Sequence, residues 1–161
     1  MGAEGDLVPP RLARGCRCFG AWAGEELIAY GWLAFEPEWI GEVGLEIRPQ
    51  PGDGYIWNCV TLAPHRRRGN FAALVVFMTA QARSEGRSRM WIASVEGSAE
   101  SAVAYAGFVP VLRIAAHTLP GLRRLHVGPV AGAGPALVAA ACRALSVGLG
   151  WSLRRRRTRR H

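Results

Sequence analysis

Runs rich in apolar, β-branched and aromatic residues, separated by Gly, Pro and acidic turn residues, recur along the chain and are typical of β-strands. Strands are predicted at residues 16–23, 27–35, 39–48, 55–62, 90–95 and 108–118. Between the last three of these strands the pattern changes to the helical period, at residues 70–84 and 98–106. Strands joined through helices in this way indicate an α/β (α+β) fold with a mixed or parallel sheet.

The clearest helix is the one predicted over residues 70–84. Its apolar positions recur at helical spacing and form one continuous face, made of Phe71, Leu74, Val75, Met78 and Ala82. The strand at 55–62, which precedes this helix, is apolar enough to be buried on both faces. We therefore expect it to lie at the centre of the sheet, with the helix packed against it.

The distribution of glycine, proline and charge predicts how the chain is organised. Residues 1–15 form an irregular, Gly/Pro-rich lead-in, and residues 16–127 form the main domain. Residues 128–153 are a Gly/Ala-rich C-terminal segment in which a helix over 135–153 is weakened by two glycines. Residues 154–161 read RRRRTRRH and are predicted to be a disordered basic tail, because like charges repel one another.

The charge of the chain favours an anionic partner. The formal net charge is +8 at pH 7, the sequence contains no lysine, and no Asp or Glu follows Glu100. Such asymmetry is typical of proteins that bind a nucleotide, a nucleic acid or a membrane surface. Binding of nucleic acid or an anionic membrane through Arg154–Arg160 is therefore one hypothesis for the function.

The cysteines do not indicate a metal site or a disulfide framework. Cys16, Cys18, Cys59 and Cys142 lack the paired spacing of zinc ligands, so no metal is expected. They are interpreted as reduced thiols of a cytoplasmic protein. The first residues, MGAEGDLVPP, lack the basic and then apolar layout of a signal peptide.

The segment after the central strand carries the strongest chemical signal. The strand 55–62 ends in a turn, three arginines and Gly69 follow, and the predicted helix begins at Asn70. A helix N-terminus presents free backbone N–H groups and the positive end of the helix dipole. With arginines beside it, this arrangement predicts a phosphate site in which the backbone at 67–71 contacts the anion.

The spacing Arg66-x-x-Gly69-x-Phe71 after a strand resembles the acyl-CoA-binding motif of the GNAT superfamily of N-acyltransferases, in the variant with an aromatic residue at the last position. A second element supports the resemblance. Ser98-x-x-Ser101 and the ending Gly107-Phe108 resemble the N-x-x-S and G-F positions of the family's following helix. Together the two elements place the resemblance over roughly residues 15–115.

The resemblance implies a mixed, splayed central sheet flanked by helices, with a shortened N-terminal part. It implies acyl-CoA, above all acetyl-CoA, as the co-substrate and a small amine or a protein amine as the acceptor; a homodimer is compatible with it. Pantetheine would lie between the strands 55–62 and 90–95, near Val60 and Thr61. The remaining implied contacts to the co-substrate are Arg66, Arg67, Arg68, Gly69, Asn70, Phe71, Ser98 and Ser101.

The catalytic residues do not follow from the resemblance. Many members carry a tyrosine that protonates the leaving thiolate, but Val103 occupies that position here and Tyr105 comes two residues later. Many also place a glutamate on the central strand, where this chain has Asn58; Glu46 on the preceding strand is the other acceptor-side candidate. A catalytically degenerate CoA-binding module is therefore the alternative, and the short stretch before the first strand favours it as well.

Overall fold

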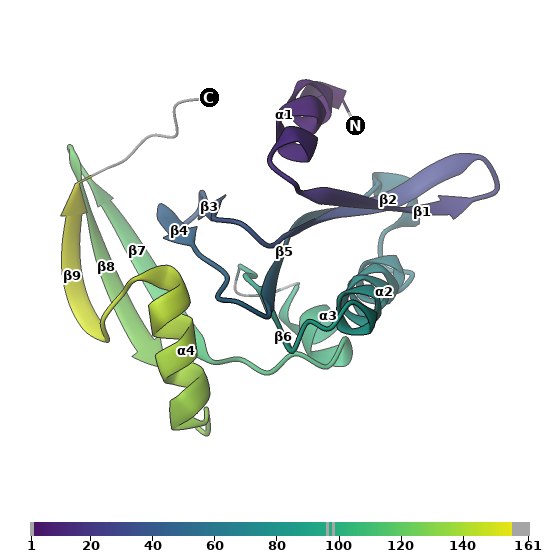
Figure 1. Cartoon of the computed structure of the whole chain (residues 1–161). Helices are drawn as coiled ribbons and strands as arrows, with labels where there is room; N and C mark the ends of the chain where they lie inside the picture. The colour runs from purple at the N-terminus through teal and green to yellow at the C-terminus, as the bar shows by residue number, and fades with distance from the viewer. Residues whose placement is uncertain (1, 96, 98, 156–161) are drawn as a thin grey trace. The chain divides into compact units, whose positions relative to one another are not determined.

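The computed structural model describes residues 2–95, 97 and 99–155. The chain forms two compact units (Figure 1). One consists of Met1–Glu36 with Pro49–Phe108, and the other of Pro37–Arg48 with Val109–His161. The segment between residues 37 and 48 thus groups with the C-terminal part of the chain, which differs from the continuous domain predicted over 16–127.

The first unit contains helices on both sides of a mixed sheet. The elements are η1 (Gly2–Leu7), α1 (Val8–Ala13), β1 (Arg17–Ala23), β2 (Glu26–Ala34), β5 (Asp53–Thr61), η2 (Ala63–His65), α2 (Asn70–Ser84), β6 (Arg89–Ile92) and α3 (Glu100–Tyr105). The strand order is β1-β2-β5-β6, in which the first two pairs are antiparallel and β5 pairs with β6 in parallel. The predicted mixed central sheet flanked by helices is confirmed.

The pairing of β5 with β6 ends before β5 does. Its last register pair is Ile56 with Ile92, whereas β5 continues to Thr61. In the described part of the chain, the second half of β5 therefore has a strand partner only on its β2 side. This is the place where the sequence predicts that the sheet splays.

A β-bulge interrupts β5 on its other side, opposite Gly31. Tyr30 pairs with Val60 and Trp32 with Trp57, so that Gly31 alone faces both Asn58 and Cys59. Asn58 takes up the extra residue with φ of 45°, in the left-handed region that asparagine tolerates better than most residues. The bulge re-aims the side chains of β5 where the pairing with β6 has already ended.

Helix α2 covers one face of this sheet. It spans Asn70–Ser84, as predicted from its periodicity, and Leu74, Val75, Met78 and Ala82 are buried. They pack with Leu33 and Ile56 of the sheet, and Phe71 and Cys59 lie at the edge of the same cluster. Burial of each large apolar side chain of this kind contributes about 1.5–3 kcal/mol.

The N-terminal segment covers the opposite face, where a second cluster contains Cys16, Tyr30, Trp32 and Ala34 with Val8 packed against it. The prediction that residues 1–15 are irregular is wrong for this segment, because residues 2–13 are helical. The prolines that suggested an irregular lead-in lie in the first turn of α1. Proline is accepted there, since the backbone N–H groups of a first helical turn have no intrahelical partner.

The second unit contains a hairpin, a helix and an antiparallel sheet. The elements are β3 (Glu38–Ile40), β4 (Leu45–Ile47), β7 (Leu112–Leu119), β8 (Leu122–Pro129), α4 (Pro135–Leu145) and β9 (Gly150–Arg155). The predicted strand 39–48 is in fact two short paired strands, with Gly44 at φ of 64° in the turn. The sheet order is β7-β8-β9.

Two predictions for the C-terminal segment differ from the structure. Helix α4 ends at residue 145, where Ser146 adopts a left-handed conformation. Arg154 and Arg155 lie in β9 rather than in a disordered tail.

The tight packing at Gly31 generates a stability prediction. A Cβ atom at this position would lie 2.7 Å from Cys59 Sγ and 3.1 Å from Met78 Sδ. We expect Gly31→Ala to lower the free energy of unfolding by about 1–3 kcal/mol, measured by chemical denaturation, because a packed core resists an added methyl group. Gly5→Ala, whose added Cβ would meet nothing within 4 Å, is the matched control. An equal effect of both changes would contradict this account of the core.

The thiol of Cys59 makes the stability depend on pH. Burial raises its pKa to about 12, although a hydrogen bond from the Trp32 backbone acts in the opposite direction. The unfolded chain loses this proton near pH 9 and the folded chain does not, so the stability is complete below pH 9 and falls as the pH rises towards 12.

Between pH 8 and pH 10 we expect the free energy of unfolding to fall by about 1 kcal/mol because of this group. Cys59→Ala should show a correspondingly flatter profile in chemical denaturation. Burial also raises the pKa of Cys18, which acts in the same direction, so the informative quantity is the difference between the two profiles. Parallel profiles for the two proteins would show that Cys59 ionises normally in the folded state.

Candidate active site

The loop between β5 and α2 has the backbone geometry of an anion site. Arg67 and Gly69 have φ of 60° and 79°, and Gly69 is the N-cap of α2 without any side-chain cap. The first intrahelical hydrogen bond is donated by Ala73 to Gly69 at 3.0 Å. The N–H groups of the preceding residues are therefore open to a ligand, and the two left-handed residues Arg67 and Gly69 turn the backbone sharply just before the positive end of the helix dipole, where anions bind.

Two of the predicted phosphate ligands hold this loop in place. Asn70 Nδ2 donates to the backbone oxygen of His65 at 2.9 Å, and Arg66 Nε donates to the backbone oxygen of Thr61 at 3.0 Å. His65 in turn contacts Glu26 at 3.0 Å through Nε2. Arg67 and Arg68 are exposed, whereas Phe71 is half-buried against the core. The loop is thus braced by its own side chains, and the exposed arginines are its charged surface.

The end of β5 leads directly into this loop. Val60 and Thr61 are half-buried and lie beyond the last residue of β5 that pairs with β6. The Thr61 hydroxyl is buried and has no hydrogen-bond partner among the described residues. The Thr61 hydroxyl can therefore pair with a polar group of a ligand that enters beside the strand, whereas the Thr61 backbone oxygen is already engaged by Arg66.

A polar cluster lies on the α1 side of β5, at the bulge. Asn58 Nδ2 donates to Glu4 Oε2 at 2.6 Å, and Arg11 Nη1 donates to the same oxygen at 3.4 Å. The Glu4 side chain is 40% exposed, whereas the Arg11 side chain is 7% exposed. The carboxylate is therefore held from the inside and remains accessible from outside.

Aromatic rings fix the position of Arg11 in this cluster. Its guanidinium carbon lies 5.0 Å from the ring centroid of Trp32 and 4.7 Å from that of Trp57. Tyr30 is buried beside these rings and forms a hydrogen bond with Glu4. Its burial and, to a smaller extent, the negative charge of Glu4 raise the pKa of Tyr30, so the phenol stays neutral. The contact of Glu4 with Asn58 could not be predicted from the sequence, because the two residues lie 54 positions apart and no local pattern connects them.

Helix α3 carries one of the two serines that the resemblance assigns to the co-substrate. Ser101 lies on it and is exposed, while Ser98 lies outside the described residues. Val103 is half-buried and Tyr105 is 83% exposed. Tyr105 therefore points into solvent, as expected from its distance of two residues along the helix from the position of Val103.

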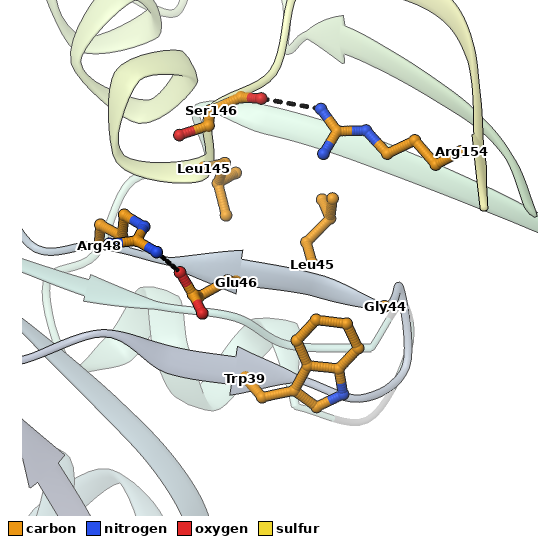
Figure 2. Close-up of a pocket in the computed structure, with 8 residues that line it drawn as sticks. All are labelled: Trp39, Gly44, Leu45, Glu46, Arg48, Leu145, Ser146 and Arg154. Atoms are coloured by element: carbon orange, nitrogen blue, oxygen red, sulfur yellow. Dashed lines mark hydrogen bonds and ion pairs between the residues drawn. The ribbon is translucent and has the colours of Figure 1, made fainter. Parts of the chain in front are cut away.

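Glu46, the second acceptor-side candidate, lies in the other compact unit. It belongs to β4 and forms an ion pair with Arg48. Both residues line a cavity of about 490 Å³. Figure 2 shows them there together with Trp39 and Arg154. Arg154 Nη2 donates to the Ser146 backbone oxygen at 2.8 Å. In the first unit, to which Asn58 belongs, the carboxylate that contacts it is Glu4.

Among the described residues, no group of three or more His, Cys, Asp and Glu side chains is arranged so that it could hold a metal ion. Within the same residues, none of the helices combines the length and the apolar character needed to cross a membrane.

Comparison with known proteins connects the first unit with one family. Residues 5–108 match the model of the family described as the acetyltransferase (GNAT) family. The match covers more than half of the chain and includes the loop before α2. It begins at residue 5, so it includes Arg11 but not Glu4. No curated protein matches the sequence.

Solved structures share the fold at low sequence identity. A protein of Agrobacterium tumefaciens str. C58 assigned as an acetyltransferase is 20% identical, with a TM-score of 0.51 over 68% of this chain and 73% of that chain. One from Pyrococcus furiosus, also assigned as an acetyltransferase, is 16% identical, with a TM-score of 0.52 over 71% and 73%. An aminoglycoside 6'-N-acetyltransferase from Acinetobacter haemolyticus is 14% identical, with a TM-score of 0.51 over 71% and 77%.

Proposed function

The chain belongs to the acetyltransferase (GNAT) family, and we propose that it transfers an acyl group, in the first instance acetyl, from an acyl-CoA to the nitrogen of an amine. The observation that carries the proposal is the loop at residues 66–69, which opens α2 at the end of the half-paired strand β5. The family implies an acyl-CoA co-substrate. The loop would hold its pyrophosphate, and the half-paired part of β5 would hold its pantetheine.

The pyrophosphate of the co-substrate suits the loop before α2. The backbone N–H groups at Gly69, Asn70 and Phe71 supply donors, and the exposed Arg67 and Arg68 supply charge. Pantetheine carries amides that need partners, and the half of β5 beyond Ile56 offers backbone groups without a neighbouring β6 strand. These two features support binding of the extended co-substrate from the loop along β5.

The chemistry requires one bond to form and one to break. The amine nitrogen attacks the thioester carbonyl carbon, the C–N bond forms and the C–S bond breaks, so that the products are an amide and CoA thiol. One proton must leave the nitrogen and one must reach the sulfur. Alignment of the amine with the thioester by the protein supplies much of the rate, because it replaces a bimolecular encounter with a positioned one.

Glu4 is the group that we assign to the amine proton. Its carboxylate is accessible, is held by Asn58 and Arg11, and lies at the bulge of the strand that would carry the thioester. It would accept the proton directly or through one water molecule, which is the range over which general bases act. Tyr105 is assigned no role in protonating the sulfur, because it is directed to solvent.

A CoA-binding module without activity is the alternative, and it makes the opposite prediction for turnover. Both hypotheses require CoA to bind at the loop before α2. Only the enzyme releases thiol when acetyl-CoA is mixed with a suitable amine. Thiol release across a panel of primary amines and lysine-containing peptides, compared with calorimetric binding of CoA, distinguishes them.

A charge placed in the loop tests the binding site. We expect Gly69→Glu to weaken acetyl-CoA binding by at least about 30-fold in calorimetry, because a carboxylate would face the pyrophosphate. Gly69→Gln is the matched control, since it carries the same backbone strain at φ of 79° without the charge, and a Cβ at this position meets nothing within 4 Å. Equal affinities for the two variants would place the pyrophosphate elsewhere.

Removal of the Glu4 carboxylate tests catalysis separately from binding. With an acceptor amine in hand, we expect Glu4→Gln to reduce kcat about 100-fold while the affinity for CoA is unchanged. Tyr105→Phe is the comparison, and its effect should stay below about threefold because the side chain is in solvent. If Glu4→Gln retains full turnover, or if Tyr105→Phe shows the large loss instead, the assignment of the proton transfer is wrong.

A further inference from the structure

The sheet of the second unit has an outer face with a distinctive composition. Side chains alternate between the faces of a strand, and Leu125 and Val127 of β8 are buried. The neighbouring positions Arg124 and His126 therefore belong to the outer face. By the register of the sheet, His117 of β7 lies opposite Arg124, while Trp151 and Leu153 of β9 lie opposite His126 and Arg124.

Planar groups are gathered around Trp151 on this face. The Arg124 guanidinium carbon lies 4.1 Å from the centroid of the Trp151 ring. The ring of His126 lies 4.7 Å from that of Trp151, and the ring of His117 lies 6.0 Å from it. Despite these contacts Trp151 is 55% exposed and Leu153 is 60% exposed. The face thus presents flat rings and a guanidinium to solvent.

The charges of this sheet have one sign. No Asp or Glu follows Glu100 in the sequence, so β7, β8 and β9 carry only basic ionisable side chains. The arginine at 154, on the inner side of β9, already donates to the Ser146 backbone oxygen. On the outer face, the guanidinium of Arg124 lies over Trp151 and is exposed. A ligand of this face must therefore be anionic and must offer surfaces that stack on rings.

We propose that the outer face of the β7–β8–β9 sheet binds single-stranded nucleic acid, with a base stacked on the Trp151 cluster and a phosphate on Arg124. Single strands expose the flat faces of their bases, whereas the bases of a duplex are covered by their neighbours. Stacking on aromatic side chains combined with arginine contacts to phosphate is the usual mode of single-strand binding on open sheets. An anionic membrane would be attracted by the same charge and can also accept an exposed tryptophan at its interface, so vesicles form the second arm of the test below.

The test uses the full chain and a fluorescently labelled oligo(dT) of about 12 nucleotides, within the length that single-strand sites cover. Fluorescence anisotropy at low salt should show binding, and Trp151→Ala should weaken it by at least about tenfold, the loss expected when one stacked base is released. Trp151→Phe, which keeps a stacking ring, should stay within about threefold of the unchanged protein. Thermal unfolding of each variant shows whether the sheet is intact.

The contribution of charge is tested with a matched pair. Arg124→Gln should weaken binding and reduce its salt dependence, whereas Arg143→Gln removes the same charge from α4 and should change affinity by less than about twofold. Vesicles that contain phosphatidylserine are the second probe. Absence of oligonucleotide binding at low salt, equal losses for the two arginine variants, unchanged affinity in a folded Trp151→Ala, or binding to the vesicles alone would each overturn the proposal.

Discussion

Backbone hydrogen bonding between β5 and β6 stops at Ile56 and Ile92, although β5 continues to Thr61. Backbone N–H and C=O groups need partners, so a strand that loses its neighbour within a domain creates a place for another extended molecule. The chain then turns directly into the loop at residues 63–69 and starts α2. The half-paired strand and the open helix N-terminus are therefore consecutive in sequence. A single ligand that contacts both is the simplest way to satisfy their polar groups.

The opposite side of β5 depends on a buried cation. Arg11 is buried with its guanidinium against the rings of both Trp32 and Trp57, and burial of a charge is costly unless it is compensated. The two rings and the Glu4 carboxylate provide that compensation. As a consequence, Glu4 is held at the bulge even though its own segment is a short 3-10 helix with little packing of its own. A carboxylate thus reaches the place where the central strand carries Asn58, which cannot accept a proton.

The elements that were predictable from sequence are those that depend on local patterns. The helix at 70–84 has a continuous apolar face, and its bounds were predicted correctly. By contrast β9 contains Gly150 and consecutive arginines, and it is a strand because it pairs with β8. No strand was predicted at the place of β8, although the alternation of Leu125 and Val127 with polar neighbours is a local signal for one. Contacts such as that between Asn58 and Glu4 join distant segments through packing, and no periodicity reports them.

Arginine has two different tasks in the two proposals. At the loop before α2, the backbone defines the shape of the site, Gly69 leaves its N–H groups accessible, and Arg67 and Arg68 add charge to a geometry that is already set. On the outer face of the β7–β8–β9 sheet, the central strand β8 is paired on both of its sides, so that recognition on this face falls to the side chains. The first arrangement suits one compact anion in a fixed position. The second suits a flexible polyanion that can adjust to Trp151 and Arg124, and this difference follows from where the free hydrogen-bond donors lie.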